Sequence, residues 1–251
     1  MLLIDYLYTL ISYFKQPRKR KWIKLSKSLS NKIGLEIGGP SNFFSLGGYF
    51  PVYLFGKQID VVNFSTDTVW EGSIKEGMNY HYYKKKSGYQ YIAEATDLNK
   101  VNDQKYDFVL SCHSLEHVAN PLKALFEWKR IMKSKGIIML VLPFKENTFD
   151  INRPFTNFYH LLEDYKNGID ESDTTHFEEI IKLHEVGRDS GFVSAEAFKE
   201  RLQNNLTNRC AHHHVFSNSV VKEMLEHVGF TVIEQEIVPP FHLVTYAQLT
   251  V

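Results

Sequence analysis

Side chains that could bind a metal ion occur at two places in the chain. His113, Glu116 and His117 are separated by three and four residues, a spacing that places them on one face of a helix. The histidine run 212–214 can supply a further imidazole, and we favour His214 because apolar residues follow it. Imidazole and carboxylate groups bind divalent ions, and such an ion would lower the pKa of a bound hydroxyl group.

The same residues allow chemistry without a metal. Imidazole accepts a proton near neutral pH, so His113 and His214 are candidate general bases for a hydroxyl group. In this alternative, Glu116 and His117 only cap a helix and bond the backbone. The residues alone leave both alternatives open.

A strand and a glycine turn must position these groups. The apolar run that contains Glu36 ends in Gly38-Gly39, the pattern of a buried parallel strand that leads into a tight turn. Because glycine has no Cβ, the backbone at Gly38 and Gly39 can approach a ligand closely. His113 follows another apolar run, at the edge where parallel sheets bind ligands.

Seven segments have the composition of strands. They are residues 33–37, 58–64, 89–95, 106–112, 137–144, 231–238 and 242–249. Helices are predicted from Asn120-Pro121 onward and over 217–228, which Gly229 ends. The last two strands are joined by a short turn, so they must be antiparallel. The pattern predicts an α/β fold, a doubly wound and mostly parallel seven-stranded sheet with an antiparallel C-terminal hairpin.

Composition divides the chain into four parts. They are an N-terminal helical and basic segment (1–31), a cofactor-binding core (32–144), an acceptor-side insertion (145–216) and the end of the core (217–251). In the insertion, aromatic, histidine and charged residues mix without strand periodicity. We therefore expect a helical cap there, with helices near 174–186 and 194–204.

The charge composition argues against a protein that binds nucleic acid. The 251 residues include 29 Lys and Arg and 29 Asp and Glu, whereas phosphate binding needs a basic excess. Cys112 and Cys210 lack the spacing of metal ligands and are too few for a disulfide framework. This use of cysteine fits a protein of the reducing cytoplasm.

The first 27 residues allow two interpretations. Residues 2–14 are largely apolar, and Arg18-Lys19-Arg20-Lys21 follows them. The apolar run is too short to span a bilayer, and its charges follow it, unlike those of a secretory signal. The segment is either a helix packed on the domain, which we favour, or an amphipathic helix on the anionic inner face of a membrane.

Several motifs, in order, resemble class I S-adenosylmethionine-dependent methyltransferases of the branch whose fourth strand is followed by Leu-Glu-His. They are Glu36-Ile-Gly-Gly-Pro-Ser, Glu94-Ala-Thr-Asp-Leu, Tyr106-Asp-Phe-Val-Leu-Ser-Cys-His-Ser-Leu-Glu-His-Val-Ala-Asn-Pro, and Lys133-Ser-Lys-Gly before an apolar strand. The Gly-Gly-Pro-Ser variant and the segment Asn208-Arg-Cys-Ala-His-His-His-Val-Phe also resemble bacterial polysaccharide-modifying methyltransferases. The resemblance implies a Rossmann-like methyltransferase fold and S-adenosylmethionine as cofactor.

The resemblance also implies cofactor contacts. Glu36 and Gly38 would lie by the methionine moiety, Asn63 would bind the ribose where the family usually has an acid, and Phe64 would pack on the adenine. The remaining implied contacts are Gly39, Pro40, Glu94, Ala95, Thr96, Ser111, Cys112 and His113. Pro40 stands where the family commonly has its second glycine, so we expect the loop to differ there.

The metal interpretation has a parallel of its own. His113, Glu116 and His117 resemble the Glu-x-x-Glu-His metal motif of ubiquinone-type O-methyltransferases and small-RNA 2′-O-methyltransferases, with His in the first position. The resemblance implies a divalent ion that a later histidine, here His214, completes.

The residues and the resemblance together predict an S-adenosylmethionine-dependent O-methyltransferase. Its acceptor would be a small molecule or a glycan-linked group, such as a sugar hydroxyl or a phosphoryl-type oxygen of a surface polysaccharide precursor or decoration. Arg209 is a candidate for holding an anionic acceptor group. The alternative is a non-catalytic scaffold or partner subunit of a biosynthetic complex, because Pro40 and Asn63 depart from the family pattern. Affinity for the cofactor distinguishes the two.

Overall fold

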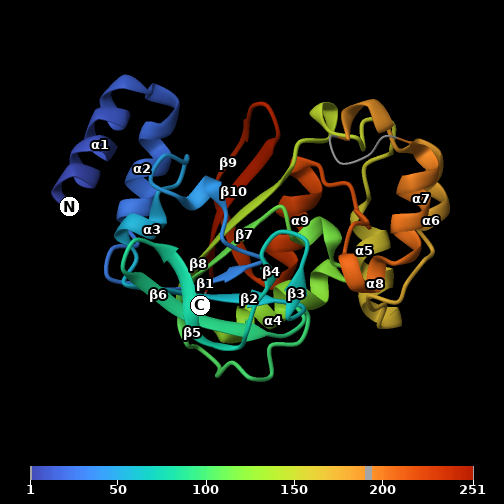
Figure 1. The fold of residues 1–251 in the computed structure, drawn as a ribbon, viewed down its shortest axis with the longest axis horizontal. Helices are drawn as coiled ribbons and strands as arrows, with labels where there is room; N and C mark the ends of the chain where they lie inside the picture. The colour runs from blue at the N-terminus through green and yellow to red at the C-terminus, as the bar shows by residue number, and fades with distance from the viewer. Residues whose placement is uncertain (1, 190–193, 251) are drawn as a thin grey trace.

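The central element is a mixed eight-stranded β-sheet (Figure 1). The computed structural model describes residues 2–189 and 194–250. The strands of this sheet are β1 Ile33–Ile37, β2 Gln58–Asn63, β5 Gly77–Tyr83, β6 Lys86–Ile92, β7 Tyr106–Cys112, β8 Met132–Pro143, β9 Phe230–Val238 and β10 His242–Leu249. Their order is β5-β6-β2-β1-β7-β8-β10-β9. A separate small sheet pairs β3 (Asp67–Thr68) with β4 (Gly72–Ser73).

The strand directions confirm the mostly parallel sheet and its C-terminal hairpin. Strands β6, β2, β1, β7 and β8 are parallel, whereas β10 pairs antiparallel with both β8 and β9. The predicted number of seven strands is wrong, because β5 adds an antiparallel edge strand beside β6. Tyr80 and Tyr82 of β5 are buried and His81 between them is exposed, as in a strand. The sequence did not predict this strand, because polar residues elsewhere in the stretch obscure the alternation of apolar and polar positions.

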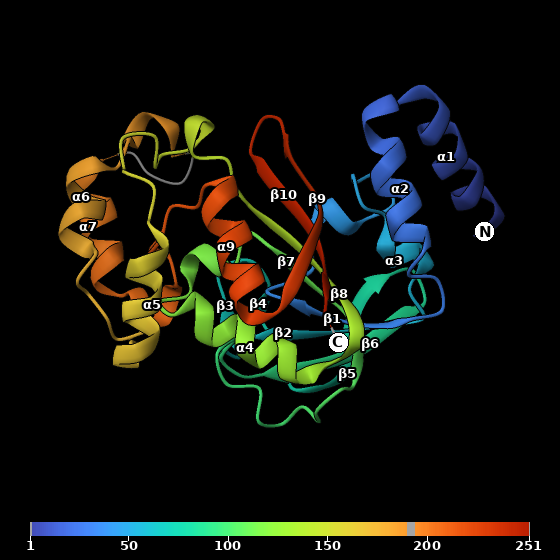
Figure 2. The ribbon, with the colours of Figure 1, turned by 180° about the vertical axis from the view of Figure 1, so that it is seen from behind.

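Helices cover both faces of the sheet (Figures 1 and 2). On one face lie α4 (Pro121–Ile131) and α9 (Asn218–Val228), and on the other α2 (Arg20–Lys27) and α3 (Val52–Phe55). Trp128 of α4 and Trp22 of α2 are fully buried, each in the apolar cluster of its own face. The core is therefore two apolar layers on either side of the sheet.

Local sequence explains where α4 and α9 begin and end. The Asn120 side chain accepts a hydrogen bond from a first-turn amide of α4, and Pro121 is the first helical residue. The Ser217 hydroxyl caps α9 in the same way, and Gly229, with a φ of +106°, ends it. Both predicted helices are confirmed.

The insertion forms a lobe of short helices at the opposite end of the molecule from the N-terminal helix (Figure 1). Its helices are α5 Phe158–Asn167, α6 Phe177–Leu183, α7 Ala195–Gln203 and α8 Asn205–Asn208. Helices α6 and α7 match the two that were expected, whereas α5 was not expected although Asn157 caps its start and Gly168 (φ +66°) its end.

Short 3-10 helices are η1 Pro17–Lys19, η2 Asn42–Phe44, η3 Leu115–His117, η4 Lys145–Asn147 and η5 Val186–Arg188.

Helix α1 (Leu2–Lys15) packs on the domain with its polar side. Asp5, Thr9 and Ser12 are buried, and Asp5 accepts hydrogen bonds from the hydroxyl of Tyr83 (2.6 Å) and from Lys84. Exposed large apolar residues of α1 are Leu3, Ile4, Tyr6, Leu7, Tyr8, Leu10, Ile11 and Phe14. The favoured packing is thus present, but the apolar side of the helix faces outward. Among the described residues, no helix combines the length and apolar composition that crossing a membrane requires.

Candidate active site

A cavity of about 320 Å³ lies at the carboxyl ends of β1, β2, β6 and β7. Between β1 and β7 the strand order reverses, which is where open α/β sheets bind ligands. The cavity is lined by Ile37, Gly38, Pro40, Ser41, Val62, Asn63, Phe64, Trp70, Ala93, Glu94, Ala95, Cys112, His113, Ser114, His117, Val118, Glu171 and Arg209. We call it the first cavity.

Most residues that the resemblance named as cofactor contacts meet at the first cavity. They are Gly38, Pro40, Asn63, Phe64, Glu94, Ala95, Cys112 and His113. Glu36, Gly39, Thr96 and Ser111 do not line it. Ser111 is fully buried one residue before Cys112, because neighbouring residues of a strand point to opposite faces.

Glu36 lies behind the cavity wall and supports the glycine turn. Its carboxylate is fully buried and accepts hydrogen bonds from the hydroxyls of Ser41 (2.8 Å), Tyr53 (2.6 Å) and Tyr80 (2.7 Å). Burial raises the pKa of Glu36 to about 7, although the three hydroxyls favour its charged form. A Cβ at Gly39 would lie 2.2 Å from the Glu36 carboxyl carbon, so only glycine fits beside this carboxylate.

Asn63 leaves a hydrogen-bond donor at the cavity. Its Oδ1 accepts a hydrogen bond from Trp70 Nε1 (3.1 Å), while its buried Nδ2 has no partner within the described part of the chain. A buried amide without a partner costs stability unless a ligand satisfies it. Asn63 therefore fits the hydroxyl-binding role that the resemblance implied. Trp70 was not expected at the site, because it lies in a loop without a periodic pattern.

Arg209 joins the insertion to the core across the first cavity. Its two Nη atoms donate to Glu94 (2.5 Å) after β6 and to Glu171 (2.8 Å) of the insertion, and its guanidinium lies 4.8 Å from the centre of the Phe64 ring. The side chain is only 10% exposed. Because both Nη atoms are engaged by carboxylates, the arrangement does not favour the expected anionic acceptor at Arg209.

A second cavity of about 300 Å³ adjoins the first. Trp70, His117 and Arg209 line both cavities, so the two spaces meet at these residues. The other residues of the second cavity are Val69, Phe149, Asp189, Phe198, Arg201, Asn208, Cys210 and His212. Its wall thus combines aromatic rings with hydrogen-bonding groups.

Glu116 is buried beside His117, which lines both cavities, but Glu116 itself lines neither. It is 1% exposed, and neither carboxylate oxygen has a hydrogen-bond partner among the residues that the structure describes. Its Oε1 lies 3.7 Å from His113 Nδ1 and 4.0 Å from His117 Nε2. Burial raises the pKa of Glu116 to about 7, with a smaller opposing effect from His212.

The imidazoles of His117 and His212 are oriented by partners at Nδ1. His117 Nδ1–H donates to the carbonyl of Ala211 (3.0 Å), and His212 Nδ1–H donates to Asp150 Oδ2 (2.5 Å). Burial disfavours a charge on His212, but Asp150 and Glu116 together outweigh it and raise the pKa of His212. One atom each of Glu116, His117 and His212 lie within 4.8 Å of one another. We call these three residues the junction cluster.

The junction cluster corrects the expected ligand set. Residues 113–117 do not form an α-helix, because His113 has a φ of +52° and only η3 is helical. The histidine from the 212–214 run that lies beside Glu116 is His212, whereas His214 is buried elsewhere and bonds Ala119 O (3.1 Å). His113 points its Nε2 at His242 Nδ1 (2.9 Å), and burial lowers its pKa to about 3, which makes it a weak base.

The raised pKa of Glu116 predicts a pH-dependent effect of Glu116→Gln on stability. A carboxyl group whose pKa rises from its ordinary 4.5 to about 7 on folding stabilises the protein below pH 4.5, and this contribution is lost as the pH rises through 7. In chelator-treated protein at pH 8, the variant should exceed wild type in unfolding free energy by about 1–3 kcal/mol. Urea unfolding should show this gain disappearing near pH 4.5. The exposed Glu146→Gln is the control, and an equal difference at both pH values would contradict the burial of a charged Glu116.

Comparison with known families gives a match over most of the chain. The family described as "Methyltransferase domain" matches residues 24–235, from α2 to β9. A comparison with curated proteins gives no significant match.

Solved structures are similar in fold. A SAM-dependent methyltransferase from Methanosarcina mazei shares 13% identity over 91% of this chain and 97% of its own, with a TM-score of 0.51. An S-adenosylmethionine-dependent methyltransferase from Mesorhizobium loti shares 10% identity over 92% and 96%, also with a TM-score of 0.51. At such identities the likeness shows the fold alone, and the family match carries the assignment. The chain belongs to the methyltransferase-domain family and is a class I S-adenosylmethionine-dependent methyltransferase.

Proposed function

We propose that this methyltransferase acts on an oxygen atom of a sugar-type acceptor, such as a hydroxyl group of a surface polysaccharide precursor or decoration. The observation that carries the proposal is the second cavity, which meets the first at His117. Aromatic rings of Trp70 and Phe149 beside polar groups of Asn208 and His212 suit the apolar faces and hydroxyl edges of a sugar ring. A hydroxyl acceptor is favoured over a phosphoryl oxygen, because Arg209 is paired with two carboxylates.

The first cavity is assigned to the cofactor, which supplies an electrophilic methyl group on a sulfonium. Asn63 would donate its unpaired Nδ2 to a ribose hydroxyl, and Phe64 would pack against the adenine. Gly38 (φ +74°) lines the cavity, and a larger residue does not fit there because a Cβ would lie 2.6 Å from Ser114 Oγ. Glu36 stabilises this glycine turn, because its buried carboxylate accepts a hydrogen bond from Ser41 in the following loop.

The junction cluster fits a divalent metal ion. The unpaired carboxylate of Glu116 and two imidazoles with oriented Nδ1 atoms form a three-ligand set of the kind that catalytic sites use. Glu116, His117 and His212 would hold the ion, which would lower the pKa of a bound hydroxyl group. In metal-free protein, Glu116 is a better-matched proton acceptor than His113, because its pKa of about 7 lies near neutral pH.

Two measurements test the proposal. Calorimetric titration of S-adenosylhomocysteine into the purified protein should show micromolar binding with and without a chelator. Methyl transfer is then screened with nucleotide sugars and short glycans, and formation of S-adenosylhomocysteine is the readout. Transfer that a chelator abolishes supports the junction metal, and transfer that it leaves unchanged supports the metal-free base. Folded protein that binds no S-adenosylhomocysteine would leave the scaffold alternative.

We further propose that α1 contacts an anionic membrane surface, which would place the enzyme at the inner face of a cytoplasmic membrane. Leu7 is 55% and Ile11 45% exposed on the outward apolar side, and Lys15 and Arg18 are exposed at its end. An apolar helix face with adjacent basic residues binds anionic lipid surfaces.

Vesicle co-sedimentation tests the membrane contact. The protein should bind phosphatidylserine-containing vesicles and dissociate from them at high salt, because salt screens the attraction between its basic residues and the anionic lipids. The double change Leu7→Asp and Ile11→Asp should weaken binding at least about 10-fold, since it places two charges on the exposed apolar face that would enter the membrane surface. Ile233→Asp, at a comparably exposed position of β9, should leave binding unchanged. Equal binding by all three proteins would exclude the role of α1.

A further inference from the structure

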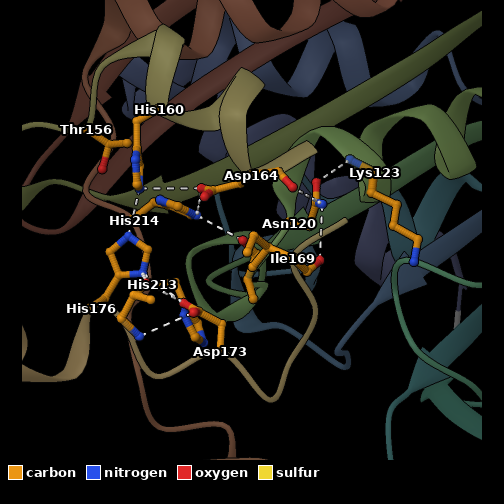
Figure 3. Close-up of polar contacts among 12 residues, drawn as sticks. Asn120, Lys123, Thr156, His160, Asp164, Ile169, Asp173, His176, His213 and His214 are labelled. Carbon is orange, nitrogen blue, oxygen red and sulfur yellow. Dashed lines mark hydrogen bonds and ion pairs between the residues drawn. The ribbon is translucent and has the colours of Figure 1, made fainter. Parts of the chain in front are cut away.

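Four side chains of the insertion converge at a point outside both cavities (Figure 3). His160 and Asp164 come from α5, His176 precedes α6, and His214 precedes α9. Each offers one nitrogen or oxygen atom, and the four atoms lie within 4.8 Å of one another. We call these four residues the insertion cluster.

Distances between the ligand atoms of His160, His176 and Asp164 are close to those in a tetrahedral ion site. His160 Nε2 lies 2.8 Å from His176 Nε2 and 3.4 Å from Asp164 Oδ2. In His214 the nitrogen that is free to bind an ion is Nδ1, because Nε2–H donates to Ala119 O. Ligands of a four-coordinate zinc ion lie about 3.3 Å apart, because each is about 2.0–2.1 Å from the ion. The observed distances lie on both sides of that value.

Hydrogen bonds within the insertion cluster leave two buried atoms unsatisfied. Asp164 is 7% exposed, and its Oδ2 has no hydrogen-bond partner among the described residues. His214 donates from Nε2 to Ala119 O (3.1 Å), while its Nδ1 is buried without a partner in the same part of the chain. A hydrogen bond between His160 and His176 would satisfy these two residues but would leave Asp164 Oδ2 and His214 Nδ1 without partners. A bound cation would satisfy all four residues.

Outer partners fix the orientation of the ligands. His176 Nδ1 lies 3.3 Å from Asp173 Oδ2, which leaves the lone pair of Nε2 for the cluster. Asn120 Nδ2 donates to the carbonyl of Asp164 (3.1 Å) and ties this part of α5 to the core.

We propose that the insertion cluster binds one transition-metal ion of the zinc class, with His160, Asp164, His176 and His214 as its ligands. Three imidazoles and one carboxylate suit Zn²⁺, whereas Mg²⁺ and Ca²⁺ prefer oxygen ligands. Because protein side chains fill all four positions, the ion has a structural role. The inference does not depend on the proposed acceptor or on the junction cluster.

The ion would hold one wall of the first cavity. Glu171 lies on the loop between Asp164 and His176, and its Oε1 accepts a hydrogen bond from the amide of Ala119 (3.1 Å) while Oε2 pairs with Arg209. Fixing both ends of this loop restricts Glu171 to the position in which it lines the cavity. Loss of the ion should therefore loosen the insertion.

The test measures metal binding to the full chain with the junction cluster disabled. Chelator-treated His212→Ala protein is titrated with Co²⁺ and then with Zn²⁺ in competition. We expect one equivalent of Co²⁺ with the strong visible absorption of four-coordinate cobalt, which Zn²⁺ displaces. Combining His212→Ala with Asp164→Asn or His176→Ala should lower the affinity for the metal ion. The decrease should exceed the about 10–100-fold that is lost when a residue that only hydrogen-bonds a ligand is removed. His81→Ala, at an exposed histidine of β5, is the matched control and should leave the affinity unchanged.

Thermal unfolding gives a second readout. Zn²⁺ at about 100 times its Kd should raise the Tm of the His212→Ala protein by about 5–10 °C, and this gain should vanish with Asp164→Asn. Asp164→Asn keeps the shape of the side chain, so it decides the matter if His176→Ala fails to fold. The proposal is overturned if His212→Ala binds no equivalent of metal, or if Asp164→Asn leaves affinity and Tm gain unchanged.

Discussion

Replacing His212 with alanine is expected to slow methyl transfer at least about 100-fold while the affinity for S-adenosylhomocysteine changes less than about twofold. His212 lines the second cavity and not the first, so its loss removes a junction-cluster ligand without touching the proposed cofactor site. It also leaves Glu116 with one imidazole fewer to balance its buried carboxylate. The rate is measured with the acceptor that the screen identifies, and the affinity by calorimetry.

Two further variants sharpen this result. Asp150→Asn keeps the shape of the residue that accepts the His212 Nδ1–H bond but removes its charge, and it should reduce the rate by about 10–100-fold. His81→Ala should have no effect, because His81 is exposed on the edge strand β5. A His212→Ala enzyme with the wild-type rate would exclude the junction cluster from the reaction.

The sheet could be predicted because its strands carry their own signals. The apolar run before Gly38, the strand from Tyr106 to Cys112 and the hairpin about Pro239-Pro240 each show composition and turn residues that few other structures allow. Strand β5 lacked such a signal, because only Tyr80 and Tyr82 face inward. Its pairing with β6 depends on tertiary contacts.

The histidine run shows where sequence reasoning about the site ends. The spacing of the sequence identified Glu116 and His117 as candidates. Which histidine of the run 212–214 lies beside them depends on how that irregular segment crosses η3. A backbone hydrogen bond from His213 N to Glu116 O (2.8 Å) sets that crossing and turns His212 toward the junction. His214 then faces Asp164 of α5, a helix that was not expected. Neither contact leaves a periodic pattern in the sequence.

Arg209→Met is expected to destabilise the protein by about 2–4 kcal/mol at pH 8, somewhat less than the about 3–5 kcal/mol for breaking a fully buried ion pair. The expected loss is smaller than for a fully buried ion pair because Glu94 is 40% exposed and water can solvate its charge. Glu171 is 12% exposed and would keep an unpaired charge. Methionine retains much of the apolar volume over Phe64, so the change tests the charge. Because Glu171 and Arg209 both line the first cavity, the affinity for S-adenosylhomocysteine should fall at least about 10-fold as well.

The pH dependence of this loss identifies its cause. Burial raises the pKa of Glu171 to about 7 even with Arg209 beside it, and removal of the guanidinium should raise that pKa further. Below pH 6, Glu171 in the variant is neutral and carries no unpaired charge, so the stability deficit should shrink as the pH falls from 8 to 5. Urea unfolding of both proteins across this range provides the measurement, with Arg188→Met at an exposed arginine of the insertion as control. A deficit that stayed constant with pH would assign the effect of Arg209 to packing, since the charges on Glu171 and Glu94 are what would make the deficit depend on pH.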